Sequence, residues 1–399
     1  MSGPRVLMTA DTLGGVFTYA VDLAEAIGQR GGSVALATMG AALSPEQRRL
    51  VASVRGLSVF ESTYRLEWMD DPWDDVARAG EWLMKLEAEL APDVVHLNGY
   101  AHAALPLRAP VIVVAHSCVV SWFRAVLGRE APAAYDRYRI EVARGIAAAD
   151  ALVAPTQAML EAAERHHGPA RRARVIANAS DPTRFRPALV KEHHVLALGR
   201  IWDQAKNIAA LAAVAPRLPW RVRVGGSARA PGKSAIPGRT EGQEQSGEGT
   251  SEAAHLDTLG VLSRDEAARA LSRAAIYALP ARYEPFGLSI LEAALSGCAL
   301  VIGDIPSLRE VWGEGCAARY VDPDDPDALE AALRSLIEAP ELRAAMGERA
   351  RSHALRYAPS RMAEAYLALY AEVALRDPAP RRARSPLHAD ARAVEDPCA

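Results

Sequence analysis

The sequence has few of the features that mark secreted, membrane-spanning or nucleic-acid-binding proteins. Its four cysteines form no C-x-x-C pair and no cluster with histidine, so neither a disulfide framework nor a zinc site is expected. No apolar run approaches the roughly 18 residues of a membrane-spanning helix. Lysine and arginine number 46 against 49 aspartates and glutamates, so the basic excess of a typical nucleic-acid-binding protein is missing. The first ten residues lack the pattern of a secretory signal. We therefore expect a cytoplasmic, metal-free protein that binds no nucleic acid.

Enough apolar sequence is present for a large core, since half of the 399 residues are hydrophobic. At about 150 residues per domain, this length predicts two or three domains. Short apolar runs alternate with helical patterns, as in α/β proteins whose parallel sheets are covered by helices on both faces. The expected strands are 5–8, 33–38, 57–60, 93–97, 111–115, 151–154 and 175–177 in the first half, and 195–198, 221–224, 256–259, 276–279, 300–302 and 319–321 in the second.

The two series of strands meet near residues 178–191, where Pro182 and Pro187 interrupt the pattern. We therefore expect one domain at 1–186 and a second at 187–358. An amphipathic pattern predicts a last helix at 359–375. Residues 376–399 carry four prolines without periodicity and are expected to be a disordered tail. Residues 227–253 are rich in glycine, serine and glutamate, which predicts a mobile surface loop of open function.

Unusual polar residues and glycines follow many of the expected strands. In open parallel sheets, ligands bind beyond the carboxyl ends of the strands. Segments of this kind are Thr9 to Gly15, His96 to Gly99, His116-Ser117, Gly199 to Asn207, Gly225-Gly226, Arg282 to Gly287 and Gly303-Asp304. Two domains with their polar loops at the sheet edges predict a binding cleft between them.

The segment R-Y-E-P-F-G-L-S-I-L-E carries the most specific pattern. The proline after Glu284 disfavours helix there, so the helix is expected to start near Gly287. The backbone N–H groups of Gly287, Leu288 and Ser289 then form an anion site, with Glu292 one to two turns further on. A nucleotide sugar would fit, with sugar hydroxyls at Glu284, the diphosphate at the helix tip and ribose hydroxyls at Glu292. The alternative is a solvated helix with two surface glutamates.

A second segment, G-R-I-W-D-Q-A-K-N, supplies two cations directly after a strand. Arg200 offers a planar set of donors and Lys206 a compact charge. Beside a helix-tip anion site, the pair would neutralise a diphosphate leaving group without a metal ion. The alternative is an Arg and a Lys in a solvated loop.

Together these segments resemble the GT-B glycosyltransferases, in particular the retaining enzymes of glycosyltransferase family 4, over roughly residues 5–375. The E-x7-E motif corresponds to Glu284 and Glu292, and the G-R…K element to Arg200 and Lys206 with one extra residue between them. The early glycine loop corresponds to Gly14 and Gly15. In the A-N-A-S-D stretch, Asn178 takes the place of the asparagine of the family's P-N-G-V-D.

The resemblance implies a GT-B fold, in which two Rossmann-like parallel-sheet domains face each other across a cleft. The N-terminal domain would bind the acceptor, the C-terminal domain the nucleotide sugar, and the last helix would cross back to the N-terminal domain. The implied reaction moves a sugar from a nucleoside diphosphate sugar to an acceptor hydroxyl with retention of configuration. No metal or cofactor is implied, and the resemblance favours a UDP-sugar as donor.

The resemblance also implies roles for individual residues. His116 is expected beside the donor sugar and is grouped with Glu284, Arg200 and Lys206 as catalytic. The expected donor contacts are Gly14, Gly15, Asn178, Arg200, Lys206, Glu284, Gly287, Leu288, Ser289 and Glu292. Asp11 and His96 are expected to contact the acceptor, which could be a glycan, a lipid-linked glycan or a small molecule.

Several points stay open at this stage. The basic residues of 165–174 are compatible with contact to an anionic acceptor or to the inner face of a membrane, but a solvated loop is the favoured explanation. Other GT-B activities, such as a sugar-nucleotide epimerase or a phosphorylase, and a non-catalytic nucleotide-sugar-binding protein remain alternatives. The sugar, the acceptor and the oligomeric state are not determined by the sequence.

Overall fold

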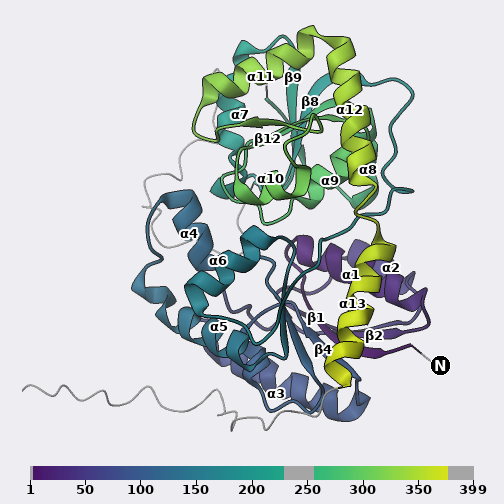
Figure 1. The fold of residues 1–399 in the computed structure, drawn as a ribbon, viewed down its shortest axis with the longest axis vertical. Coiled ribbons are helices and arrows are strands. Elements are labelled where there is room, and N and C mark those ends of the chain that lie inside the picture. The colour runs from purple at the N-terminus through teal and green to yellow at the C-terminus, as the bar shows by residue number, and fades with distance from the viewer. Residues whose placement is uncertain (1–2, 229–255, 376–399) are drawn as a thin grey trace, which may run out of the picture.

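The computed structural model describes residues 3–228 and 256–375 and contains two parallel β-sheets, one in each half of the chain (Figure 1). The predicted α/β fold with two parallel sheets is confirmed. Of the loop expected at 227–253, only the first two residues are described, and the tail expected at 376–399 lies outside the described residues.

The N-terminal sheet has seven strands in the order β3-β2-β1-β4-β5-β6-β7. They are β1 (Arg5–Asp11), β2 (Ser33–Met39), β3 (Leu57–Glu61), β4 (Val94–Leu97), β5 (Val111–Val114), β6 (Ala151–Ala154) and β7 (Ala173–Val175). The helices of this half are α1 (Gly15–Gly28), α2 (Pro45–Ala52), α3 (Trp73–Leu90), α4 (Val119–Leu127), α5 (Asp136–Ala148) and α6 (Gln157–His167), with short 3-10 turns η1 (Ala101–Ala104) and η2 (Ala133–Tyr135). Every residue of β4, β5 and β6 is buried, as expected for central strands covered on both faces.

The C-terminal sheet has six strands in the order β10-β9-β8-β11-β12-β13. They are β8 (Glu192–Leu198), β9 (Arg221–Gly225), β10 (Leu256–Gly260), β11 (Ala274–Leu279), β12 (Ala299–Gly303) and β13 (Arg319–Val321). Its helices are α7 (Ile208–Val214), α8 (Arg264–Arg273), α9 (Leu288–Leu295), α10 (Pro306–Trp312), α11 (Pro326–Glu338) and α12 (Pro340–Ala354), with 3-10 turns η3 (Gln204–Lys206) and η4 (Ala215–Arg217). All expected strands form; β7 lies two residues before its predicted position.

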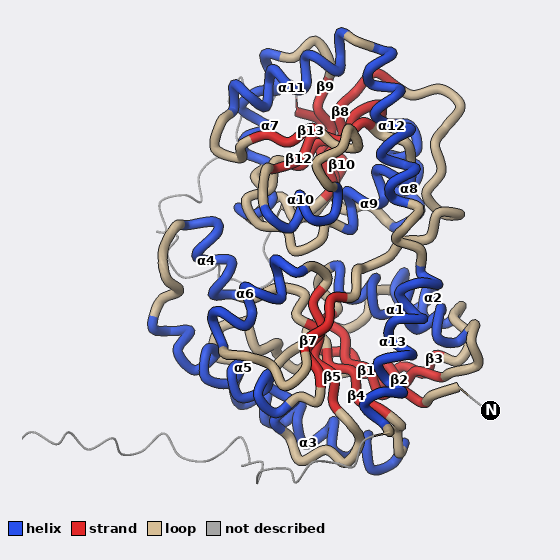
Figure 2. The backbone as a smooth tube through the Cα atoms, viewed as in Figure 1, coloured by secondary structure: helices blue, strands red, loops and turns tan. Residues whose placement is uncertain are grey.

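The last described helix, α13 (Pro359–Ala374), leaves the C-terminal half and packs against α1 of the N-terminal half (Figure 2). Its buried face holds Met362, Tyr366, Leu369 and Tyr370, which join the core formed by α1 and one face of the N-terminal sheet. The hydroxyl of Tyr19 on α1 donates to the hydroxyl of Tyr366 over 2.6 Å.

Polar contacts also join the two halves near the sheet edges. Arg264, at the start of α8, forms a buried ion pair of 2.6 Å with Asp22 on α1. The carboxylate of Glu310 on α10 accepts hydrogen bonds from the N–H groups of Gln157 and Ala158, which open α6, over 2.6 and 2.9 Å. The free N–H groups of a helix start favour a carboxylate at this position. The carboxyl ends of the two sheets are therefore held facing each other.

The close approach of β12 to the loop after β11 depends on Gly303. A Cβ atom on Gly303 would lie 2.2 Å from the carbonyl oxygen of Ala281, which is backbone and cannot move aside cheaply. We predict that Gly303→Ala lowers the free energy of unfolding by about 1–3 kcal/mol, as measured by urea denaturation. Gly315→Ala is the matched control, because a Cβ at Gly315 meets no atom within 4 Å and its backbone is unstrained. Equal stability of the two variants would contradict the packing argument.

Candidate active site

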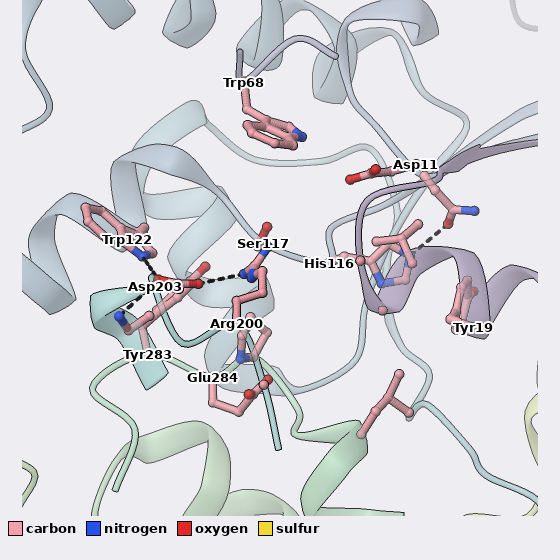
Figure 3. Close-up of a pocket in the computed structure, with 18 of the residues that line it drawn as sticks. Asp11, Tyr19, Trp68, His116, Ser117, Trp122, Arg200, Asp203, Tyr283 and Glu284 are labelled. Carbon is pink, nitrogen blue, oxygen red and sulfur yellow. Dashed lines mark hydrogen bonds and ion pairs between the residues drawn. The ribbon is translucent and has the colours of Figure 1, made fainter. Parts of the chain in front are cut away.

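A cavity of about 710 Å³ lies between the carboxyl ends of the two sheets and is lined by both halves of the chain (Figure 3). It collects twelve of the thirteen residues that the sequence predicted for the site: Asp11, Gly14, Gly15, His116, Asn178, Arg200, Lys206, Glu284, Gly287, Leu288, Ser289 and Glu292. The thirteenth, His96, is not among the lining residues. Both glutamates of E-x7-E are part of the cavity wall, so the alternative of two solvated surface glutamates does not hold.

Helix α9 points its start at the cavity. Gly287 precedes the helix with a φ of +89°, a left-handed conformation that favours glycine. We expected the N–H of Gly287 to be free, but it donates to Oε1 of Glu284 over 3.1 Å. This N–H is bonded because the Glu284 side chain folds back over the turn and meets the positive end of the helix. The N–H groups of Leu288 and Ser289 have no partner inside the helix and remain available for the predicted anion site.

The two predicted cations are each paired with a carboxylate. Lys206, at the end of η3, forms an ion pair with Oε2 of Glu284. Arg200 donates from Nη2 to Oδ2 of Asp203 over 2.7 Å, and its guanidinium lies 5.3 Å from the ring centre of Trp202. The 3-10 turn η3 lies between the two cations, and both side chains line the cavity. The sequence did not reveal this internal charge balance.

Glu292 titrates near neutrality in this environment. Burial raises its pKa to about 7, and the charge of Asp22 adds to the rise. The guanidinium groups of Arg264 and Arg184 oppose it. Arg264 is ion-paired to Asp22, so its positive charge interacts with the carboxylates of both Asp22 and Glu292. Glu292 is therefore a carboxyl group whose charge changes around neutral pH.

The tautomer of His116 follows from its contact with Asn98. The side-chain amide of Asn98 donates from Nδ2 to the carbonyl oxygen of Thr9 over 2.7 Å, so its Oδ1 faces Nε2 of His116 at 2.8 Å. A carbonyl oxygen only accepts, so Nε2 of His116 carries the hydrogen and Nδ1 is left with a lone pair. Burial lowers the pKa of His116 to about 3, which keeps the ring neutral. The ring of Tyr19 packs edge-on against it at 4.5 Å.

His96 is a corrected prediction. It is completely buried, and Tyr370 of α13 lies 2.7 Å from its Nδ1, whereas its Nε2 lies 3.3 Å from Oδ1 of Asn98. It therefore cannot contact an acceptor directly. His96 and Val94 share the face of β4 that α13 covers, whereas Asn98 lies past the end of the strand and reaches the cavity. Asn98 falls within the predicted loop segment His96 to Gly99, but no sequence motif indicates its role.

Asp11 and the glycine pair face the donor elements across the cleft. Burial raises the pKa of Asp11 to about 6, although the Leu13 N–H and the charge of Arg200 act against this rise. Gly15 lies against the side chain of Leu288 on α9, since a Cβ there would be 3.7 Å from its Cδ1. Asn178 in the linker is buried, and its Oδ1 has no hydrogen-bond partner among the described residues.

Three of the basic residues of 165–174 have partners within the described chain. Arg172 and Arg174 pair with Glu372 of α13, and His167 is buried with its Nε2 3.1 Å from Sγ of Cys118. Within the described ranges, no helix is long and apolar enough to cross a membrane. Nor do His, Cys, Asp or Glu side chains of the described residues form a group of three or more that could hold a metal ion.

Comparisons with known proteins agree with this geometry. A model described as Glycosyltransferase Family 4 matches residues 13–184, and one described as Glycosyl transferases group 1 matches residues 186–353. A phosphatidyl-myo-inositol mannosyltransferase of Mycolicibacterium smegmatis is 34% identical over 165 residues, and the match spans 41% of each chain. A glycogen synthase of Mycobacterium tuberculosis is 29% identical over 69% of this chain and 67% of its own.

Two solved structures share the fold along nearly the whole chain. Sucrose-phosphate synthase from Thermosynechococcus elongatus superposes with a TM-score of 0.72 at 18% identity, covering 93% of this chain and 99% of that one. Anabaena Alr3699/HepE in complex with UDP-glucose superposes with a TM-score of 0.69 at 17% identity, covering 92% and 99%. With two family models that together match residues 13 to 353 and two Rossmann-like sheets around one cleft, the chain belongs to the GT-B glycosyltransferases of family 4.

Proposed function

We propose that the protein transfers a sugar from a UDP-sugar to an acceptor hydroxyl, with retention at the anomeric carbon and without a metal ion. The observation that carries the proposal is the meeting of the α9 start, Arg200, Lys206 and Glu292 at one wall of the cavity between the two halves. The donor class is supported by HepE, whose structure was solved with UDP-glucose. The cytoplasmic location and a peripheral membrane contact remain predictions.

The donor diphosphate is assigned to the N–H groups of Leu288 and Ser289. There it lies close to Arg200 and Lys206, which would exchange part of their pairing with Asp203 and Glu284 for the phosphate oxygens. Two protein cations supply the charge that a metal ion supplies in other transferases. The ribose hydroxyls are assigned to Glu292, further along α9.

The sugar is placed between Glu284 and His116. The lone pair on Nδ1 of His116 accepts a hydrogen bond from a sugar hydroxyl, and the neutral ring does not act as an imidazolium acid. Glu284 is held by Lys206 and the Gly287 N–H, so it is a binding group and not a nucleophile. Gly14, Gly15 and Asn178 complete the donor side, and Asp11 lies on the acceptor side.

The reaction is then a displacement on one face of the sugar. The acceptor oxygen forms a bond to the anomeric carbon as the bond from that carbon to the diphosphate oxygen breaks. The acceptor proton passes to the departing phosphate oxygen. Negative charge grows on the diphosphate, where the helix start, Arg200 and Lys206 are already in place to stabilise it.

A thermal-shift panel with UDP, GDP and ADP tests the proposed donor. We expect UDP to raise the melting temperature, since a ligand at 100 times its Kd stabilises a fold by about 2.7 kcal/mol.

Arg200→Ala should slow release of UDP from the sugar nucleotide by about 100-fold, measured by a coupled UDP assay. Arg221→Ala is the control, because Arg221 pairs with Asp257 on the exposed surface. Absence of a shift with all three nucleotides would contradict a nucleotide-sugar site.

The titration of Glu292 predicts the pH dependence of donor binding. The ionised carboxylate accepts hydrogen bonds from both ribose hydroxyls, whereas the protonated form loses acceptor capacity below its pKa of about 7. Affinity for UDP-glucose should therefore rise by about tenfold from about pH 6 to about pH 8, as followed by calorimetry. Glu292→Gln should flatten this profile. A slope that persists in the variant would assign the titration to another group, such as Asp11.

The Asn98 contact predicts one tautomer for His116. In ¹⁵N NMR spectra, His116 should carry its hydrogen on Nε2 and should not titrate between about pH 5 and about pH 8. Asn98→Asp places a carboxylate against Nε2–H, which should raise the pKa of His116 by at least about one unit and add a pH-dependent step to turnover. A hydrogen on Nδ1 in the wild-type protein would disprove the assignment.

A further inference from the structure

The cavity continues past His116 into the N-terminal half, away from the donor elements. There it lies between the loop 62–72, which follows β3, and helix α4 with the turn η2 behind it. Six of the side chains that line this part are aromatic or aliphatic: Trp68, Trp122, Phe123, Leu127, Tyr135 and Tyr138. We call these six residues the aromatic wall. Figure 3 shows Trp68 across the cavity from Arg200 and Glu284.

Within the aromatic wall, Trp122 is half-buried, and the buried rings of Phe123, Tyr135 and Tyr138 pack in a chain that leads from it into the core. The ring centres of Trp122 and Phe123 lie 5.3 Å apart, those of Phe123 and Tyr135 5.5 Å, and those of Tyr135 and Tyr138 6.4 Å, with tilted or edge-on geometry. The indole N–H of Trp122 donates to Asp203 over 3.1 Å, so this ring is also anchored to the C-terminal half. Trp68 is half-buried and packs against the same hydrophobic core as Trp122.

The polar groups beside the aromatic wall are already engaged. Both carboxylate oxygens of Glu67 accept backbone N–H groups, from Tyr100 at 3.0 Å and Ala101 at 2.8 Å. The two arginines of this region lie on its exposed rim: Arg65 donates to the carbonyl oxygen of Asp70, and Arg129 lies 6.0 Å from the ring centre of Phe123.

The backbone polar groups at the floor of this part are also bonded. The N–H of Cys118 donates to the hydroxyl of Tyr283 over 3.1 Å, and the carbonyl oxygen of Ser117 accepts from Tyr100 over 2.8 Å. A phosphate would need converging cations, and a second sugar ring would need several free donors and acceptors. This surface provides neither, but it provides a large apolar area and an aromatic face.

We propose that the aromatic wall binds an acceptor whose hydroxyl is carried on a flat, mainly apolar ring system. The ring would stack on Trp68 and against Trp122, which directs its hydroxyl toward His116 and Asp11 at the open end of the donor site. The assignment rests on the proposed function, because it takes the donor to occupy the other side of His116. It narrows the acceptor from any hydroxyl compound to one chemical class.

Calorimetry on the protein saturated with UDP tests the assignment, since UDP prevents a probe from entering the nucleotide site. We expect 2-naphthol to bind more tightly than 1-octanol, methyl α-glucoside or glucose 6-phosphate. Trp68→Ala should weaken 2-naphthol binding by about tenfold, and Trp68→Phe should restore most of it. Binding of UDP should be the same in all variants. Trp220→Ala is the control, because Trp220 stacks on His193 in the C-terminal half.

The outcomes separate the two proposals. Failure of UDP to bind counts against the proposed function and not against the aromatic wall as an apolar site. Normal UDP binding with no 2-naphthol binding, or with 2-naphthol binding that Trp68→Ala leaves unchanged, overturns the acceptor assignment. Tighter binding of 1-octanol would show a site for a chain, and tighter binding of either sugar probe a site for a polyol. Both results also overturn it.

Discussion

The positive end of helix α9 is the constraint around which the cavity is arranged. A helix start that faces a partly buried space must meet negative charge, because its first N–H groups have no partner within the helix. Glu284 provides part of that charge through the Gly287 N–H, and Lys206 in turn neutralises Glu284. A diphosphate that arrives at Leu288 and Ser289 therefore enters a site whose charges are balanced within the protein. A bound diphosphate would compete with Asp203 and Glu284 for Arg200 and Lys206, and the helix start would offset part of the negative charge that it brings.

The contacts between the two halves depend on the same charges. Arg264 pairs with Asp22 of the N-terminal half and lies close enough to Glu292 for the two charges to interact. The charge of Glu292 in the cavity wall is thus linked to the ion pair between Arg264 and Asp22, which holds the two halves together. In the C-terminal half, Asp203 also pairs with Arg200 and accepts the indole N–H of Trp122 from the N-terminal half. Asp22 and Asp203 therefore each balance an arginine and also join the two halves.

Much of the fold and of the donor wall follows from local sequence, whereas the rest depends on distant contacts. Buried parallel strands are apolar runs, and a helix start after E-P-F-G is a local signal, so the strands and the position of α9 were predictable. The pair Lys206–Glu284 joins residues 78 positions apart, and no local pattern reveals it. His96 was misplaced because strand alternation alone does not show which face α13 will cover. The aromatic wall comes from three separate segments, so its residues meet only in the folded chain.

The reacting bond is expected at the boundary between two unlike environments. Glu284, Glu292, Arg200 and Lys206 give the donor side a dense set of charges, whereas rings and backbone groups with satisfied hydrogen bonds form the acceptor side. An apolar ligand on the aromatic wall would exclude water from that side of the cavity. Coulomb interactions strengthen as the effective dielectric falls, so the attraction between Arg200, Lys206 and the departing diphosphate would increase once the acceptor is bound. The two sites would then act together, because an acceptor bound on the aromatic wall strengthens the stabilisation of the departing diphosphate by Arg200 and Lys206.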